Sequence, residues 1–550
     1  MKRHLMQSLY FALPVVAFIL IFLGLSRNFE FGTSTNFLLA SVVAGLVVWV
    51  LPTMDFEHVG GKKLLTAAQA VQEARLILKR DYPNDEGFTL WDLVKVPSEY
   101  KSTGLFIMGE MGSGKTVYLA YLIDQALKDN PNAKLVIHDY KMDIHPFLTH
   151  HLGIPEKEIK ILQPFDKRCC GWNIQADVEN EGNAESLANA LIPDPPPQAD
   201  PFWTNNARHI VTAAILFFFY KAEETPGYRW GLRELVDLLE DDEALKEVIN
   251  ADPRLRFARH AINRKNNEVL ATITAHTGGL RRIGNLWAFP DKELVSLKQW
   301  REKQERQILI LGYEESEDDG CKTLNRLLWK QLYKEILRKN LPPYETWFFF
   351  DEFYQMSRLD QIENFASVSR SFKANLVLAA QDVAQVKKVY GEDTLDILMQ
   401  GLKTQIYFRC RSKASRWAVE EIGQQKILKE STDKRIASGN VSTGVGRSES
   451  RETILMAEDI QRLMKCTSQR PVLDAVITTF IDDPFRYTMG FDAFSHVWPE
   501  KKIASDYQPE ARRERTRPRP LSDVERERLG LLIERERDED REPDEFVAEV

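Results

Sequence analysis

A glycine-rich segment of eight residues constrains the fold of this 550-residue chain more than any other part. Residues 109–116 read Gly-Glu-Met-Gly-Ser-Gly-Lys-Thr, a complete G-x-x-x-x-G-K-T phosphate loop. The apolar residues 105–108 before it predict a buried strand, and the spacing of residues 117–127 predicts a helix. This strand-loop-helix context favours a nucleotide site in an α/β domain over a chance match in a surface loop.

The residue types of this loop suit phosphate binding. Glycine permits the backbone to curl, so that N–H groups surround the β- and γ-phosphates, and the following helix N-terminus adds a favourable dipole. Lys115 can reach the terminal phosphates, and the Thr116 hydroxyl can ligate Mg²⁺. We therefore predict ATP and Mg²⁺ as cofactors, with the nucleotide held by Gly109, Glu110, Met111, Gly112, Ser113, Gly114, Lys115 and Thr116.

An aromatic strand with two following carboxylates begins at residue 347. Residues 347–353 read Trp-Phe-Phe-Phe-Asp-Glu-Phe. A buried strand can bring Asp351 to the metal at Thr116, and Glu352 can then activate the attacking water. Asp-Glu after apolar residues is common by chance. Together with the phosphate loop, it favours ATP hydrolysis over binding alone.

Two later polar residues fit an ATPase, and each also has an ordinary structural explanation. Gln381 follows the apolar residues 374–379, where its amide can sense a γ-phosphate or simply end a strand. Arg370 precedes that strand and can face a neighbouring subunit's nucleotide. From spacing alone, a surface ion pair is the commoner role for such an arginine.

Two apolar segments near the N-terminus predict transmembrane helices. Residues 8–25 carry no charge, residues 37–54 form a second run, and about 20 apolar residues cross a bilayer. Lysine and arginine flank the pair on its outer sides, which places both termini in the cytoplasm and residues 26–36 in the periplasm. A cleaved signal peptide is the alternative for the first run, but its apolar core is long for one.

Apolar spacing divides the rest of the chain into an α/β domain, an insertion and a tail. The α/β nucleotide-binding domain comprises residues 55–180 and 292–503, with further core strands at 134–139, 307–311 and 404–408. Residues 181–291 show helical spacing and predict an all-α domain inserted between the two parts. Residues 504–550 are rich in Arg, Glu, Asp and Pro and predict a largely disordered tail, with one helix from Ser522 to Arg537.

Charge and cysteine content limit the partners. The net charge of −8 excludes a uniformly basic coat, so any DNA contact is local. None of the five cysteines forms a C-x-x-C pair, which favours reduced thiols in the cytosol. One local basic cluster is a candidate DNA or substrate contact, with a solvated helical face as the commoner alternative. Its members are Arg254, Arg256, Arg259, Arg264, Lys265, Arg281 and Arg282.

The order of these features resembles the type IV coupling proteins, the TraD/TrwB-like inner-membrane ATPases of conjugation and type IV secretion. Short fragments are also similar to that family, among them residues 137–141 (Ile-His-Asp-Tyr-Lys) and 171–173 (Gly-Trp-Asn). The resemblance covers about residues 1–490 and leaves out the tail. It implies a RecA-like fold with two transmembrane helices, assembled as a homo-hexamer at the bacterial inner membrane.

The resemblance also implies roles for single residues. Lys115 and Thr116 would hold phosphate and Mg²⁺, and Asp351 would hold Mg²⁺. Glu352 would activate water, Arg370 would act across subunits, and Gln381 would be the sensor. One departure is Asp382, because the family more often has Gln-Ser at positions 381–382.

The implied function is an ATP-driven motor that delivers substrate to the secretion channel. Relaxase-bound single-stranded DNA and effector proteins are both candidate cargoes, and the acidic tail is a candidate docking site for an accessory protein. One alternative is a nucleotide-regulated membrane receptor that recruits substrate without moving it. Another is a membrane-tethered DNA translocase outside secretion.

Overall fold

The computed structural model describes residues 53–195, 200–263, 267–288, 292–437, 440–497, 507–510 and 521–531. The predicted transmembrane segments 8–25 and 37–54 lie outside these residues, except for Thr53 and Met54. These two residues belong to strand β1 (Thr53–Gly61), so the predicted end of the second segment is wrong. Within the described ranges, no helix has both the length and the apolar character needed to cross a membrane. The described residues form two compact units, one from those within 53–64 and 419–456 and the other from those within 65–418 and 457–531.

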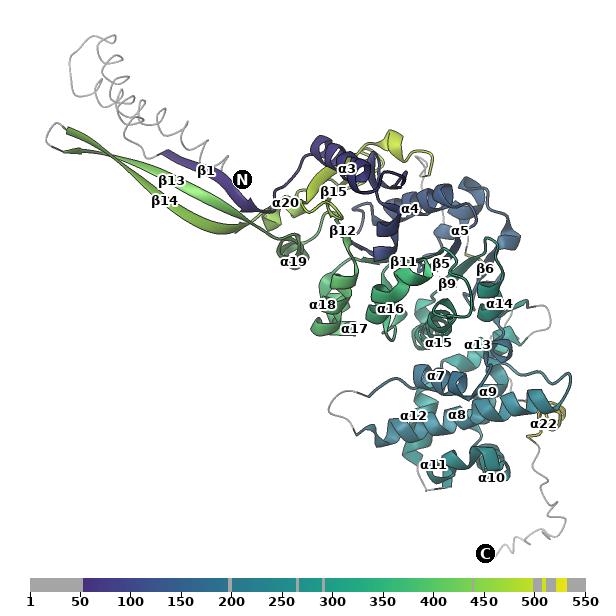
Figure 1. Cartoon of the computed structure of the whole chain (residues 1–550). Coiled ribbons are helices and arrows are strands. Elements are labelled where there is room, and N and C mark those ends of the chain that lie inside the picture. The colour runs from purple at the N-terminus through teal and green to yellow at the C-terminus, as the bar shows by residue number, and fades with distance from the viewer. Residues whose placement is uncertain are drawn as a thin grey trace, which may run out of the picture. The chain divides into compact units, whose positions relative to one another are not determined.

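The first unit contains an antiparallel ribbon of three strands in the order β1-β13-β14 (Figure 1). Strands β13 (Gln424–Ala437) and β14 (Asn440–Thr453) form a long hairpin, and β1 pairs with the outer side of β13. This hairpin lies inside residues 292–503, which were predicted as part of the α/β domain. Residues 424–453 are mostly polar and carry no run of large apolar residues, so hydrophobic periodicity gives no strand signal there.

The second unit is built on a nine-stranded sheet in the order β16-β15-β12-β4-β11-β10-β5-β9-β6 (Figure 1). The strands from β12 to β6 are parallel to one another. At the edge beyond β12, β15 is antiparallel to β12, and β16 is antiparallel to β15. The strands are β4 (Leu105–Met108), β5 (Lys134–Asp139), β6 (Ile159–Ile161), β9 (Ile308–Gly312), β10 (Thr346–Phe350), β11 (Ala374–Ala380), β12 (Thr404–Tyr407), β15 (Leu473–Thr478) and β16 (Phe485–Met489).

Helices cover both faces of this sheet, which explains why its central strands are apolar throughout. On β10, Trp347 packs at a tilted angle against Phe88 of β2 (Phe88–Trp91), with 5.3 Å between ring centroids. Phe348 and Phe350 point to the opposite face and meet Trp329 of α15 (Asp318–Ile336) at 6.0 and 5.8 Å. Such strands are the easiest to predict, and every core strand predicted from an apolar run is confirmed to within one residue.

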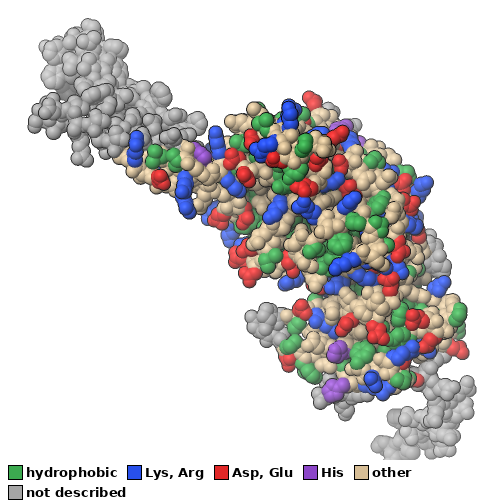
Figure 2. Space-filling view, viewed as in Figure 1, with side chains coloured by type: hydrophobic (Ala, Val, Ile, Leu, Met, Phe, Trp, Pro, Cys, Tyr) green, Lys and Arg blue, Asp and Glu red, His purple; other side chains and the backbone are tan. Residues whose placement is uncertain are grey.

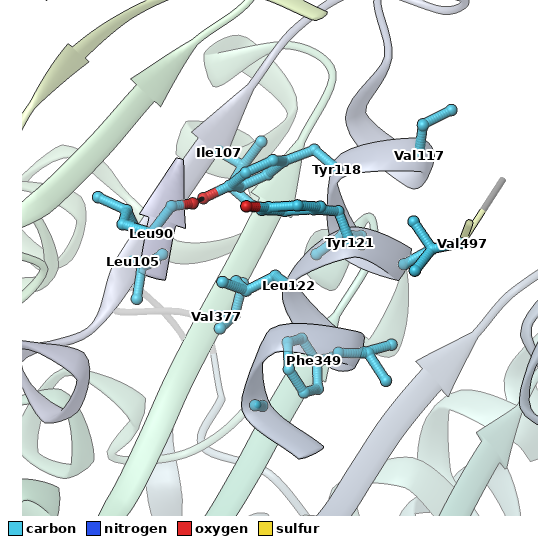
Figure 3. Close-up of a cluster of buried hydrophobic side chains, with 14 of the residues drawn as sticks. Leu90, Leu105, Ile107, Val117, Tyr118, Tyr121, Leu122, Phe349, Val377 and Val497 are labelled. Atoms are coloured by element: carbon cyan, nitrogen blue, oxygen red, sulfur yellow. Dashed lines mark hydrogen bonds between the residues drawn. The ribbon is translucent and has the colours of Figure 1, made fainter. Parts of the chain in front are cut away.

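The helix that follows the phosphate loop packs against the same sheet. Helix α4 (Lys115–Asp129) buries its Tyr118, Tyr121 and Leu122 among side chains of β4, β10 and β11 (Figure 3). The Tyr118 hydroxyl donates a 2.9 Å hydrogen bond to the Leu90 carbonyl. This packing fixes the start of α4, and therefore the position of the loop before it.

The remaining helices of the second unit pack around the sheet or connect its strands. They begin with α3 (Ala67–Asp81), which starts with a capping box between Thr66 and Gln69. β3 (Val94–Val96) pairs with β2 beside it. The others are α5 (Ile144–Pro146), α6 (Ile174–Asp177), α14 (Leu297–Glu302), α16 (Ile362–Val368), α17 (Val383–Tyr390), α18 (Glu392–Gly401) and α20 (Ala457–Gln461), and α19 (Ser412–Ile422) begins in this unit.

Between residues 181 and 287, the described residues form helices and no strands. The central helix α8 is 24 residues long and almost continuously buried from Ile210 to Phe218. Gly284 lets α13 approach α9 closely, because a Cβ there would lie 2.9 Å from the Arg233 Cα. The helices are α7 (Glu181–Leu191), α8 (Pro201–Glu224), α9 (Leu232–Glu240), α10 (Asp242–Ala251), α11 (Arg259–Asn263), α12 (Asn267–Thr277) and α13 (Leu280–Trp287).

One buried carboxylate joins the two ends of this helical block. Strands β7 (Gly171–Trp172) and β8 (Leu294–Val295) pair just before and after it. Asp177 accepts hydrogen bonds from the Trp172 indole at 2.7 Å and the Ser296 hydroxyl at 2.5 Å, and from the Leu297 amide at 2.9 Å. Burial raises the pKa of Asp177, and these donors oppose the shift. The insertion therefore enters and leaves the α/β part at one tightly bonded point.

Part of the tail packs against the helical block, as a helix within the stretch where one was predicted. Helix α22 (Asp523–Leu529) starts at the predicted cap Ser522 but ends at Gly530, where φ is +70°, rather than at Arg537. Arg526 pairs with Asp241 at 2.6 Å, and Leu529 is fully buried. The tail's composition gave no sign of this packing, because the acids that hold α22 lie in α9 (Asp237) and at its C-terminal end (Asp241).

Candidate nucleotide site

The residues predicted to bind and hydrolyse nucleotide lie at the carboxyl ends of neighbouring strands. The phosphate loop follows β4, Gln381 follows β11, and Asp351 and Glu352 follow β10. These three strands are adjacent and parallel in the sheet. Segments more than 200 residues apart in sequence thus meet at one edge, where ligands of open α/β sheets bind.

The phosphate loop has the backbone conformation that its glycines allow. Gly112 and Gly114 have φ values of +74° and +109°, and a Cβ on Gly114 would lie 2.5 Å from the Leu473 Cδ2. Lys115 is buried, and its ammonium donates a 2.8 Å hydrogen bond to the Gly109 carbonyl. Burial lowers the pKa of Lys115, while Asp351 and Glu352 oppose that shift. A bound phosphate would supply the further negative charge that this cation lacks.

Thr116 and Asp351 form an oxygen pair that fits Mg²⁺. The Thr116 hydroxyl donates a long, 3.4 Å hydrogen bond to one Asp351 oxygen, and the other oxygen, Oδ1, is buried without a hydrogen-bond partner among the described residues. Burial raises the pKa of Asp351, and Lys115 opposes the shift. A buried carboxylate oxygen beside a hydroxyl is a suitable ligand set for a hard cation.

Glu352 is held by three side chains in a strained backbone conformation. Its φ and ψ of 51° and 48° lie in the left-handed region, which non-glycine residues enter at a cost. Its carboxylate accepts hydrogen bonds from the amide of Gln381, from Gln355 Nε2 at 2.9 Å and from the Tyr354 hydroxyl at 3.1 Å. The carboxylate and the predicted sensor amide are therefore in direct contact.

A cavity of about 770 Å³ lies over these groups. Its phosphate-loop side is formed by Gly112, Gly114, Lys115 and Thr116, and Glu352 and Gln381 line it as well. Its other walls come from later in the chain. They include Lys141, Asp143, Cys466, Thr467, Ser468, Pro471 and Phe491.

Arg370 does not line this cavity. It lies on a short 3₁₀ helix (Ser369–Phe372) with 55% of its side chain exposed, and it forms an ion pair with Glu99. Glu99 also accepts a 2.8 Å hydrogen bond from the Tyr82 hydroxyl. Within one chain, Arg370 thus has the surface ion pair that its spacing favoured.

Most of the predicted basic cluster is engaged by neighbouring groups. Arg264 and Lys265 lie outside the described residues, and Arg256 is exposed. Figure 2 shows acidic and basic side chains interspersed on the visible face of the helical block. Arg254 pairs with Asp252 and Glu224, Arg281 with Glu240, and Arg282 with Glu317, while Arg259 donates to the carbonyls of Ile249 and Asn250.

Several site residues were not predicted from the sequence. His138 and Lys141 belong to the family-like fragment 137–141, which carried no assigned role, and Tyr354 and Gln355 follow the acid pair without a recognisable motif. His138 is buried on β5, and its Nδ1 donates a 3.0 Å hydrogen bond to the Asp351 carbonyl. The one signal in the sequence that could have identified these residues is their position near the ends of predicted strands, close to residues already assigned to the site.

Glu110 links the phosphate loop to the edge of the sheet beyond β12. Its carboxylate pairs with Arg409 and Arg411 at 3.0 Å each, and with Lys465 at 2.8 Å. Burial works against the charged form, but Lys465 and Arg411 hold the pKa of Glu110 below its ordinary value. The second residue of the phosphate loop is therefore a structural anchor.

Comparisons with known proteins agree with this geometry. A family model described as "Type IV secretion-system coupling protein DNA-binding domain" matches residues 92–477. Coupling protein TraD of Escherichia coli (strain K12) is 25% identical over 457 residues, which cover 78% of this chain and 60% of TraD. The chain thus spans about 60% of the length of that relative.

Solved structures of the coupling protein TrwB share the fold. The unbound bacterial conjugative coupling protein TrwBdeltaN70 aligns with a TM-score of 0.62 and 18% identity, over 82% of this chain and 95% of that one. TrwB in complex with ADP and Mg²⁺ aligns with a TM-score of 0.61 and 15% identity, over 83% and 98%. Because the family model matches well over half of the sequence, this chain belongs to the type IV secretion-system coupling protein family.

Proposed function

We propose that the chain is an ATP-hydrolysing motor that delivers substrate to a type IV secretion or conjugation channel. The observation that supports this most directly is the meeting of Lys115, Thr116, Asp351, Glu352 and Gln381 at one strand-end cavity. Of these groups, a receptor that only sensed nucleotide would need the phosphate loop alone. A carboxylate held in a strained conformation against a sensor amide adds what hydrolysis requires.

Each residue has a distinct role in the proposed reaction. The loop amides and Lys115 bind the phosphates and stabilise the charge that develops on them. Thr116 and Asp351 would hold Mg²⁺, which supplies further charge neutralisation when bound. Glu352 accepts the proton of the attacking water. Gln381 contacts that carboxylate, so a γ-phosphate that draws the amide away would also release Glu352 to meet the water.

The assembly, location and cargo in this proposal rest on family membership. We propose a homo-hexamer anchored in the bacterial inner membrane by residues 8–25 and 37–54, with both termini in the cytoplasm. The solved relative bound to ADP and Mg²⁺ supports the same cofactors here. The proposed cargo is relaxase-bound single-stranded DNA, effector proteins or both, received by the helical domain at residues 181–291. The proposed partners are the secretion channel and, for the acidic tail, an accessory protein.

Glu352→Gln separates the motor from the alternative of a receptor that recruits substrate without moving it. We expect the variant to bind ATP normally, because the phosphate loop is intact, but to lose hydrolysis by about 10²- to 10⁴-fold. Transfer in a mating or secretion assay should be lost with it. Glu392→Gln, the same exchange at an exposed glutamate on α18, is the control and should behave like the parent. Transfer that survives Glu352→Gln without hydrolysis would favour the receptor.

A further inference from the structure

Two described segments of the C-terminal tail contact different parts of the second unit. Residues 507–510, the first anchor, pair with the loop 163–168 that follows β6, and residues 521–531, the second anchor, contain α22 on the helical block (Figure 1). Helix α13 of that block packs against α15 of the α/β part. This contact and the loop 163–168 form a seam between the block and the α/β part, and the tail is attached on both sides of it.

Main-chain bonds hold the first anchor. The Lys167 amide donates to the Gln508 carbonyl at 2.7 Å, and the Glu510 amide donates to the Phe165 carbonyl at 2.8 Å. Bonds in both directions between two chain segments are those of an antiparallel strand pair. The first anchor is therefore tied to the α/β part through its backbone.

The first anchor also meets the contact that the helical block makes with the α/β part. The Tyr507 hydroxyl donates to a Glu314 carboxylate oxygen at 3.0 Å and lies 3.2 Å from the Phe165 carbonyl oxygen. The Phe165 ring centroid lies 5.7 Å from the guanidinium carbon of Arg282 on α13, and Arg282 pairs with Glu317. The first anchor is thus placed directly at the seam.

The second anchor holds the tail to the helical block. Arg526 pairs with Asp241 at 2.6 Å, and Leu531 is buried where it lines a cavity with Phe217 of α8 and Val248 of α10. These contacts belong to the block alone. One stretch of chain is therefore fixed to the α/β part at its first anchor and to the block at its second.

We propose that the tail is a strap that holds the helical block against the α/β part, and that release of either anchor lets the seam open. Two attachments in series act only while both hold, so the second anchor controls the seam although the first one touches it. This goes beyond the proposed function, because it gives the tail control over the domain proposed to receive substrate. A molecule that displaced either anchor would free the block.

Cys321 provides a native reporter of the seam. It is fully buried on α15, and a Cβ on the preceding Gly320 would lie 2.4 Å from the Gly279 carbonyl oxygen and 3.3 Å from Ile283 of α13. Burial raises the pKa of the Cys321 thiol to about 12, so the closed protein should react slowly with a thiol reagent. Opening of the seam would expose this thiol. Cys410 is as deeply buried but follows β12, and it serves as the internal control.

The decisive variant changes the anchor that does not touch the seam. Full-length protein without nucleotide is treated with iodoacetamide, and labelling of the Cys321 and Cys410 peptides is followed by mass spectrometry. Arg526→Glu should raise the labelling rate of Cys321 about tenfold, because it breaks a charge-assisted contact that holds the closed state, and should leave Cys410 unchanged. Arg528→Glu, an exposed position on the same helix, is the matched control and should label like the parent.

Tyr507→Phe tests the first anchor and should raise Cys321 labelling by a similar factor. Because the anchors act in series, the double variant should label no faster than the faster single variant. Labelling of Cys321 at the parent rate in Arg526→Glu would overturn the strap, as would a parallel rise at Cys410, which marks general loosening. A double variant at the product of the two single effects would overturn action in series. Each of these results leaves the proposed motor standing, since no measurement involves nucleotide.

Discussion

His138 shows how burial sets the chemistry of a single side chain at this site. It lies on β5 beside β10 in the register pair His138–Phe350, fully shielded from solvent. Burial lowers its pKa to about 4, although the Asp351 carbonyl and the Glu352 charge oppose the shift. The imidazole is therefore neutral at pH 7 with its proton on Nδ1, because the carbonyl it contacts can only accept. It holds the backbone of Asp351 without adding charge next to the metal ligand.

This burial predicts a dependence of stability on pH. The pKa of His138 is about 4 in the folded chain and 6.5 ordinarily, so its contribution to stability is present above pH 6.5 and is lost as pH falls through about 4. The loss amounts to roughly 3 kcal/mol. His138→Asn keeps an N–H donor near Nδ1 but does not titrate, so urea unfolding between these pH values should show a shallower decline. An unchanged pH profile would contradict this assignment.

At the scale of elements, the order of α22 depends on contacts with distant helices rather than on its own sequence. Arg526 reaches Asp237 and Asp241 at 3.3 and 2.6 Å, and Arg233 on α9 reaches Glu525 at 3.0 Å. The Tyr228 hydroxyl donates a 3.0 Å hydrogen bond to the Leu529 carbonyl. A helix of seven residues is too short to be stable in isolation, so these contacts decide whether it forms.

Arg526→Glu should therefore release α22. The variant places a third acid beside Asp237 and Asp241, and like charges at this distance repel. Amide hydrogens of residues 523–529 should exchange faster than in the parent, as judged by mass spectrometry of peptic fragments. Arg528→Glu changes an exposed residue of the same helix and is the matched control. Equal protection of both variants would show that α22 is held by its buried leucines alone.

Elements differ in how far the sequence predicted them. Strands β4, β5, β9, β10, β11 and β12 were predicted because a strand covered on both faces is an uninterrupted apolar run. The hairpin of β13 and β14 was missed because its residues are mostly polar and leave no periodicity. In the site, motifs marked the phosphate loop and the acid pair. Tyr354, Gln355 and Lys141 were missed, since only the folded chain shows that the first two bond to Glu352 and that Lys141 lines the cavity.

At the scale of the whole molecule, Arg370 has no access to the cavity of its own chain, which is consistent with a role at a neighbour's nucleotide. Arg370→Ala should bind ATP, but its ATP turnover should fall by roughly 10³-fold, because an arginine supplied in trans accelerates hydrolysis by about that factor. Lys115→Ala should also be inactive, because it cannot hold the phosphates. Mixed and reassembled, the two variants should recover part of the activity in a steady-state ATPase assay, since Lys115→Ala subunits supply Arg370 to intact loops.

A double variant is the control for this complementation. Arg370→Ala mixed with a chain that carries both Lys115→Ala and Arg370→Ala should stay inactive, because no subunit then offers the arginine. Recovery in that mixture would show that the arginine acts elsewhere. Failure of both mixtures would contradict supply of the arginine from a neighbouring subunit.

The sequence by itself determined the chemistry of this protein, and the tertiary structure decided its geometry. A phosphate loop and a strand-end acid pair are local patterns, because backbone curvature and burial on both faces impose them within a few residues. The contact between Glu352 and Gln381, the cavity that both of them line and the docking of α22 join residues far apart in the chain. Each depends on which strands become neighbours in the sheet and which helices pack together, and no local pattern carries that information.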